Sequence, residues 1–181
     1  GMISTYEVAF TTKTGKIIPV TVNGIPLDDG GTVGIFQDLR KLKAAKEEAR
    51  TNQSYFEQLF IQSADAIAAC DANEVVLDLN PAFVKLFGYT PEEAHGQHIN
   101  TLLVPPYLTA GAVDIAKRIN QGKRVYLETV RQHKSGRLID VTVTGASIMV
   151  EGKRERVGVY AIYRDITERK QAEEKMRSAA Q

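Results

Sequence analysis

Three histidines and one cysteine are the residues of this 181-residue chain best suited to bind a metal or to take part in proton transfer and nucleophilic attack. His95 and His98 lie three residues apart beside Gly96, and His133 lies far along the chain in a turn-like segment. Protein zinc sites combine several His and Cys residues at short, defined spacings. No further His or Cys has such a spacing here, so we expect surface histidines in turns.

A catalytic constellation is equally absent from the sequence. Asp65, Asp71 and Asp78 lie on or beside predicted strands, at positions that face turns or solvent. The chain has no glycine-rich phosphate loop and no nucleophile motif. The single Cys70 excludes an internal disulfide and is compatible with a reducing cytoplasm. We therefore expect no enzyme activity, and any kinase or cyclase domain would lie outside this chain.

Composition and charge exclude further classes of function. The chain is 43% hydrophobic and 25% charged, which is typical of globular proteins. Its net charge of +1 gives no basic face for nucleic acid and no attraction to an anionic membrane. No apolar run approaches the roughly 20 residues that span a bilayer. We expect a cytoplasmic protein without a membrane segment.

Two parts of the chain repeat one pattern. Residues 14–24 resemble residues 135–145 at an offset of 121, and residues 33–41 resemble residues 160–168 at an offset of 127. The second copy therefore holds six extra residues, near residues 151–155. Each copy reads as a hairpin around a Gly turn, then a strand, an Asp and a helix. Two matching blocks in the same order make a chance likeness of hairpins the weaker explanation.

The first copy continues into a charged helix. Residues 38–62 contain no Pro or Gly and are rich in Lys, Glu, Ala and Leu. Sparse apolar residues follow a heptad register that Lys46 and Gln53 interrupt. They are Leu39, Leu42, Ala49, Phe56 and Phe60. The pattern suits a weak parallel coiled coil and a solvated surface helix equally well.

Residues 63–165 read as two strands, several short helices and three further strands, which indicates an α+β domain. Asn80-Pro81 provides an N-cap and a first-turn proline, and Gly88 ends the helix that follows. Residues 90–93 form a capping box for the next helix. A third helix is predicted near residues 109–121, before strands near residues 125–132, 138–150 and 156–164.

These linked motifs resemble the PAS sensor domain family. Residues 79–83 and 87–93 with Gly96 are similar to its first half, and residues 135–137 and 163–170 to its second half, the PAC motif. The resemblance covers about residues 55–174. It implies a five-stranded antiparallel sheet in the order 2-1-5-4-3, with short helices on one face.

The repeat and the resemblance together divide the chain into four parts. Residues 1–37 resemble the last strands of a truncated preceding PAS-like domain, and residues 38–62 a linker helix. Residues 63–165 form a complete PAS domain, and residues 166–181 a C-terminal linker helix. An uncovered sheet exposes apolar side chains and a strand edge. We therefore expect residues 6–36 to pack on another chain or on the intact domain.

The resemblance implies a sensory, signal-relaying module of a bacterial histidine kinase or diguanylate cyclase. It also implies a homodimer with a downstream output domain, and a small ligand held between sheet and helices. A ligand-free dimerisation and transmission module is the alternative. Heme-binding members carry an iron-ligating His where residues 107–114 have none, and photoactive flavin members use a helical Cys, whereas Cys70 ends a strand. Both cofactors are disfavoured, and the ligand stays unidentified.

Two candidate sites follow. By resemblance and strand alternation, an apolar pocket is lined by Ile67, Ala69, Leu77, Phe83, Phe87, Ile99, Leu103, Ile115, Ile119, Leu127, Val141, Val143 and Ala161. The same residues could equally form a packed core without a void. At the end of the last strand, Asp165, Ile166 and Thr167 resemble the family's junction that couples the sheet to the exit helix. Asp165 also suits a plain N-cap.

Overall fold

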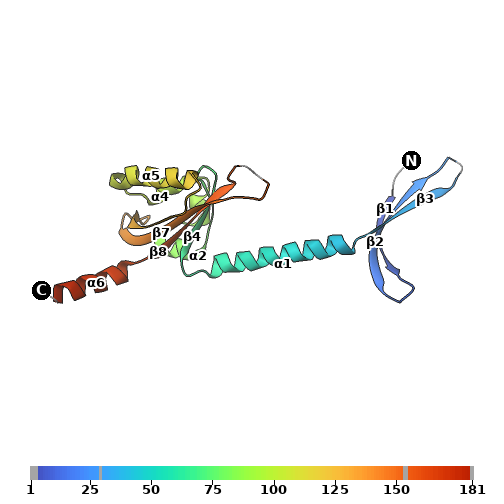
Figure 1. Cartoon of the computed structure of the whole chain (residues 1–181), viewed down its shortest axis with the longest axis horizontal. Coiled ribbons are helices and arrows are strands. Elements are labelled where there is room, and N and C mark those ends of the chain that lie inside the picture. Colours follow the sequence, from blue (N-terminus) through green and yellow to red (C-terminus); the bar gives the residue numbers. More distant parts are fainter. Residues whose placement is uncertain (1–3, 29, 153–154, 180–181) are drawn as a thin grey trace. The chain divides into compact units, whose positions relative to one another are not determined.

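The computed structural model describes residues 4–28, 30–152 and 155–179, and the chain forms two compact units, Gly1–Glu57 and Gln58–Gln181 (Figure 1). Each unit is built on an antiparallel sheet. The first sheet has the order β1-β2-β3, and the second has the order β5-β4-β8-β7-β6. Numbered within the second unit alone, that order is 2-1-5-4-3, so the predicted PAS topology is confirmed.

The first unit contains β1 (Ser4–Thr11), β2 (Ile17–Pro26) and β3 (Thr32–Asp38), and the chain then enters α1 (Arg40–Gln62). The helix starts two residues later than predicted, because the backbone of Leu39 is still hydrogen-bonded to the sheet. Its N–H donates to the Pro19 carbonyl at 2.9 Å. No residue of α1 is buried. Among the described residues, no helix combines the length and the apolar character that crossing a membrane requires.

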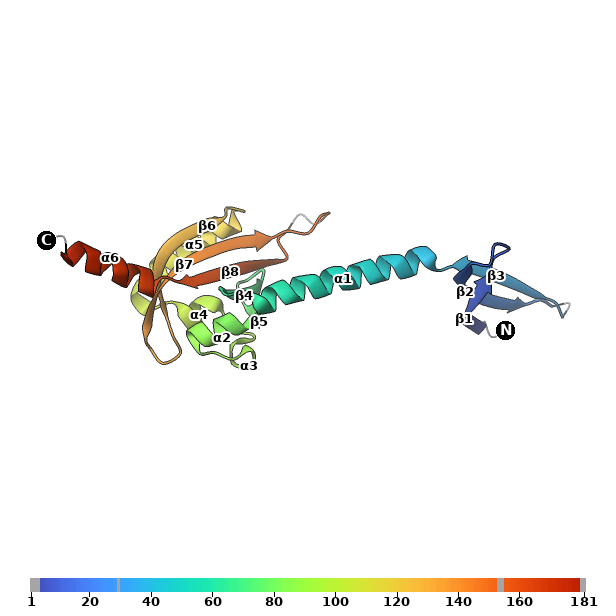
Figure 2. The same ribbon diagram turned by 90° about the horizontal axis from the view of Figure 1, so that it is seen from below.

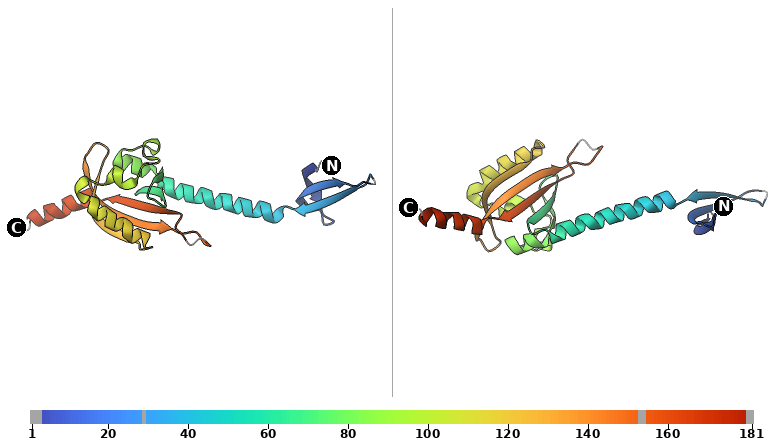
Figure 3. Two further views of the ribbon diagram at one scale, coloured as in Figure 1. Left: turned by 90° about the horizontal axis from the view of Figure 1, so that it is seen from above. Right: turned by 60° about the horizontal axis from the view of Figure 1, so that its bottom comes forward.

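The second unit starts with the hairpin β4 (Ala66–Asp71) and β5 (Val76–Leu79) and ends with β6 (Val125–Gln132), β7 (Leu138–Ile148) and β8 (Gly158–Asp165). Between them lie α2 (Pro81–Phe87), α3 (Pro91–Ala94), α4 (Ile99–Leu103), a 3-10 turn (Pro106–Leu108) and α5 (Thr109–Asn120). The last helix is α6 (Thr167–Ala179). Figures 2 and 3 show α5 running alongside the sheet and α6 leaving from the end of β8.

The sequence repeat is also a repeat of strand register. Val20 pairs with Asp38 in the first sheet, as Val141 pairs with Asp165 in the second. Likewise, β1 and β6 occupy the same positions once the offset of 121 is applied. The six extra residues lie between the ends of β7 and β8. The two sheets are therefore two copies of one module.

An aromatic cluster joins α2 to the second sheet. The rings of Phe83 and Phe87 lie 6.0 and 5.2 Å, centroid to centroid, from the ring of Tyr163 on β8, and 4.8 Å from each other. All three side chains are buried. Edge-to-face packing of this kind adds about 0.5–1.5 kcal/mol per pair beyond area burial. It holds α2 against β8, which runs in the middle of the sheet.

The fully buried amide of Asn80 organises the start of α2. Its Oδ1 accepts from the Ile67 and Phe83 backbone N–H groups at 2.8 and 2.9 Å. Its Nδ2 donates to the carbonyls of Phe60 and Asp65 at 3.1 and 2.9 Å. The predicted N-cap is thus confirmed, and the same side chain also binds β4 and the last turn of α1.

Replacing Asn80 with Ala should lower the free energy of unfolding of the second unit by about 3 kcal/mol. The helix loses its cap, which is worth about 1 kcal/mol, and buried backbone groups lose their partners at about 1–3 kcal/mol each. Urea unfolding followed by circular dichroism measures this. Asn73→Ala in the exposed β4–β5 turn is the control. Equal midpoints for the two variants would contradict the assigned role.

Candidate functional site

A small cavity lies between α5 and the sheet, with a volume of about 30 Å³. Gly145 on β7 allows the close approach of α5, because a Cβ atom there would lie 2.8 Å from Cδ1 of Ile119. A volume of this size holds about one water molecule. The lining consists of Cys70, Glu74, Ile99, Asn100, Ala112, Ile115, Ala116, Ile119, Arg131, Val143, Gly145, Val159, Ala161 and Tyr163.

The structure places ten of the thirteen predicted pocket residues in or beside the cavity. The lining includes Ile99, Ile115, Ile119, Val143 and Ala161. A second group is buried in the packed core beside the cavity instead, namely Phe83, Phe87, Leu103 and Val141. Leu127 is partly buried and packs against the core clusters on both sides. Much of the predicted pocket is therefore solid core, which was the alternative that the sequence left open.

Ile67, Ala69 and Leu77 are not among the residues that line this cavity. On β4 the buried residues are Ala66, Ala68 and Cys70, so Ile67 and Ala69 belong to the opposite face of the sheet. Side chains alternate with a period of two, so choosing the wrong parity inverts a whole strand. Leu77 is 52% exposed. The β4–β5 register shifts at Ala69/Cys70, a bulge that breaks simple alternation.

Two charged residues in the cavity wall were missed. Arg131 is only 4% exposed and Glu74 only 7%. Arg131 occupies an inward position of β6, in the alternating series that begins at Val125 and Leu127. The sequence signal that could have identified Arg131 is a charged residue at a strand position that faces inward. Glu74 has a positive φ of 64°, and it is the one such non-glycine residue in the described ranges.

The Arg131 guanidinium is incompletely bonded. Its Nη1 donates to the Val130 carbonyl at 2.9 Å and to Thr129 Oγ1 at 3.3 Å. Its Nε has no hydrogen-bond partner among the described residues. Burial lowers the pKa of Arg131, and the neighbouring Tyr163 hydroxyl opposes that shift. Burial of the Tyr163 side chain raises the pKa of its hydroxyl.

Glu74 has partners on α4 and at its cap. Its Oε2 accepts from Nδ2 of Asn100 at 3.4 Å and lies 3.9 Å from Nε2 of His98. The Glu74 carbonyl also accepts the Ile99 N–H at 3.0 Å. A non-glycine residue in the left-handed region costs on the order of 1–3 kcal/mol. These bonds hold it there, and they direct the carboxylate toward α4.

The three histidines make local structural contacts. His98 accepts from the Asn100 N–H at the start of α4, and His133 Nδ1 lies 2.9 Å from Ser135 Oγ. His95 Nδ1 lies 3.1 Å from the Leu77 carbonyl. In the described ranges, no three His, Cys, Asp or Glu side chains gather closely enough to hold a metal ion.

The second predicted site, Asp165–Thr167, joins β8 to α6. Asp165 Oδ1 accepts from the Thr167 N–H at 2.8 Å. Ile166 is 5% exposed, and its N–H donates to the Asp140 carbonyl at 2.9 Å. The start of α6 is thus bound to strand β7 by backbone as well as by side chain.

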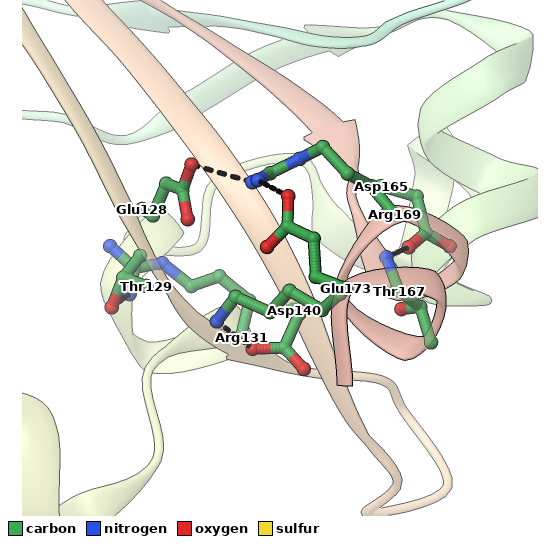
Figure 4. Close-up of polar contacts among 9 residues, drawn as sticks. Glu128, Thr129, Arg131, Asp140, Asp165, Thr167, Arg169 and Glu173 are labelled. Carbon is green, nitrogen blue, oxygen red and sulfur yellow. Dashed lines mark hydrogen bonds and ion pairs between the residues drawn. The ribbon is translucent and has the colours of Figure 1, made fainter. Parts of the chain in front are cut away.

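Ion pairs fasten the first turn of α6 to the sheet (Figure 4). Arg169 bridges Glu128 on β6 and Glu173 on its own helix, both at 2.6 Å. Lys170 Nζ lies 2.6 Å from Oδ1 of Asp140 on β7. These charges are partly exposed, and pairs of that kind contribute about 0–1 kcal/mol each. These ion pairs favour one orientation of α6, but each contributes too little free energy to fix the helix rigidly.

The first unit has the same junction. Asp38 Oδ1 accepts from the Arg40 N–H at 2.9 Å, and Leu39 is buried. Leu39 therefore anchors its own sheet and is not available to the predicted helix stripe. In that stripe, Leu42 and Phe56 are 62% and 67% exposed. Ala49 is also exposed, and Phe60 is intermediate.

The strand order and the helices of the second unit are those of a PAS domain. A family model described as the PAS domain matches residues 2–41 and 64–168, more than half of the chain. The chain belongs to the PAS domain family.

Two sensor proteins and a solved PAS domain resemble this chain at moderate sequence identity. The chain is 28% identical over 110 residues to the sensor protein FixL of Bradyrhizobium diazoefficiens, covering 59% of this chain and 22% of that protein. It is 29% identical over 134 residues to the methyl sulfide methyltransferase-associated sensor of Methanosarcina acetivorans, covering 72% of this chain and 12% of that protein. It thus spans less than a quarter of the length of each of these two relatives. The crystal structure of a PAS domain from Colwellia psychrerythraea is similar with TM-score 0.57 and 30% identity, over 64% of this chain and 98% of that one.

The Cys70 thiol should be unreactive in the folded protein. Burial raises the pKa of Cys70 to about 12, and the nearby Glu74 and Asp71 charges act in the same direction. The thiolate is the reactive form, so its fraction stays very small below that pH. Labelling with a chromogenic disulfide at pH 8 should be slow until urea unfolds the second unit. Rapid labelling of the native protein would show that the thiol is accessible.

Asp165→Ala should destabilise the start of α6 by about 1 kcal/mol, the usual value of a side chain that caps a helix. Asp165→Asn keeps the acceptor oxygen and should lose much less. Amide hydrogen exchange in the first turn of α6 measures the difference. Identical exchange in the two variants would remove the capping role.

Proposed function

We propose that this chain is a non-enzymatic sensory and signal-relay module of a larger signal-transduction protein, of the histidine kinase or diguanylate cyclase type. The observation that carries the proposal is the continuity of β8. Ala161 and Tyr163 on this strand line the cavity, and two residues further the same strand ends at Asp165 and the α6 junction. A displacement of β8 at the cavity therefore reaches α6 through the backbone.

The flanking helices support a dimer with further domains. Neither α1 nor α6 has a buried residue, and both are rich in charge. Isolated helices are marginal in water, and most draw stability from a packed apolar face. We propose that α1 finds this in a parallel homodimer, and that α6 leads to an output domain. A cytoplasmic location belongs to the same proposal.

The exposed face of the first sheet supports the reading of residues 1–37 as the end of a preceding PAS-like domain. Tyr6 and Phe36 are 62% and 61% exposed. By the repeat they correspond to Leu127, which is partly buried, and Tyr163, which is 3% exposed. We propose that the front half of that domain, or another chain, covers this face.

The alternative is a ligand-free module that dimerises and transmits strain. The small cavity favours it, because about 30 Å³ is near the size of one water molecule. The two functions differ in whether the cavity or the flanking helices receive the signal.

The relay is tested by filling the cavity wall. In Gly145→Ala the new Cβ meets the mobile end of Ile119, so α5 must shift slightly while the fold survives. We expect amide exchange at Ile166 and Lys170 to change several-fold, because both amides belong to the junction. Gly111→Ala on α5 is the control, since nothing lies within 4 Å of its Cβ. Unchanged exchange at the junction in Gly145→Ala would refute the relay.

The dimer is tested separately by light scattering after size exclusion. The proposal expects a dimer for the whole chain and a monomer once residues 1–62 are removed. A truncated chain that still dimerises would assign the interface to the second unit and count against α1.

A further inference from the structure

Arg131 is a buried charge without a counter-charge. It is 4% exposed, and none of the ion pairs among the described residues includes it. The other arginines in those pairs have side chains that are at least 45% exposed. Burying an ion without a partner is costly, and folded proteins normally pair such groups. The position of Arg131 therefore calls for an anion.

The incomplete hydrogen bonding of the Arg131 guanidinium also indicates an anion. Nη1 makes the bonds to Val130 and Thr129, while Nε has no partner in the part of the chain that the structure describes. Arg131 also lines the cavity. A guanidinium edge of this kind matches the two oxygens of a carboxylate.

The remainder of the wall restricts the ligand. Ile115 and Ile119 from α5 face Val143 and Val159 from the sheet, which suits an alkyl chain. Polyvalent inorganic anions need more donors than this wall offers, and a cation would meet Arg131. The Glu74 carboxylate also lines the cavity, but it is bonded to Asn100 and lies beside His98.

We propose that the cavity binds a short-chain monocarboxylate, with its carboxylate on Arg131 and its alkyl chain against Ile115 and Ile119. This rests on the proposed sensory function and names its ligand class. The cavity volume of about 30 Å³ suits the shortest acids of this class. Longer chains enter as Ile119, whose side-chain end touches Gly145, changes rotamer.

Titration calorimetry of the whole chain with formate, acetate, propionate and butyrate, at constant ionic strength, tests this. Each buried methylene should tighten binding about fourfold until the cavity is full. Butyramide has the shape of butyrate without its charge, and it should bind at least about tenfold more weakly. Equal affinity for butyrate and butyramide would overturn the proposal, as would no binding of any of the four acids.

Two arginine variants test whether the carboxylate binds to Arg131. Arg131→Gln should weaken butyrate binding at least about tenfold and abolish the preference over butyramide. Arg137→Gln removes the same charge from an exposed turn position and should leave both unchanged. Butyrate affinity retained in Arg131→Gln overturns the proposal. If that variant does not fold, the preference of the unaltered chain for butyrate over butyramide decides.

Glu74→Gln tests whether the anion binds inside the cavity, which Glu74 also lines. Removing the Glu74 carboxylate should tighten butyrate binding, because a like charge leaves the cavity wall. Weaker or unchanged binding in this variant would show that the anion does not lie near Glu74 in the cavity, which contradicts the proposal. Failure of all these tests leaves the relay intact, since the Gly145→Ala exchange experiment uses no ligand.

Discussion

One backbone hydrogen bond decides how each sheet passes into its helix. The Ile166 N–H donates to the Asp140 carbonyl, and the Leu39 N–H donates to the Pro19 carbonyl at the equivalent place. The acceptor is a main-chain oxygen, so Asp and Pro serve equally well at that position. The donor residue is apolar and buried in both copies. The following helix therefore starts at a fixed point against the hairpin. The same bond places the end of the preceding strand, β3 or β8, and the ion pairs of the first helical turn.

Local signals were sufficient for much of the fold. Asn80 caps α2, Gly88 ends it with a φ of 80°, and Thr90 forms a capping box, because each depends on chemistry within a few residues. The two repeat offsets, found in the sequence, also match the registers of the two sheets in the structure. The order of the five strands required the resemblance to a known family, because pairing between distant strands leaves no short-range pattern.

The candidate site was harder to predict because it depends on parity and volume. Ala and Ile are apolar on both faces of β4, so composition could not distinguish Ile67 from Ala66 as the inward residue. The bulge at Ala69/Cys70 then removed the alternation that would have placed Leu77. Whether apolar residues enclose a void is set by small differences in side-chain reach, and Gly145 opposite Ile119 is an example. Arg131 was predictable in principle, since its position on β6 has inward parity.

Strand β6 connects the two sites. Arg131 faces the cavity, while Glu128 on the same strand binds Arg169 of α6. Partly exposed pairs such as Glu128–Arg169 are worth about 0–1 kcal/mol. A ligand present at a hundred times its dissociation constant stabilises the state it prefers by about 2.7 kcal/mol. Occupancy of the cavity can therefore outweigh any one of the contacts that hold α6. A weakly fastened helix is suited to a relay because a rigidly fixed one could not respond to so small a free energy.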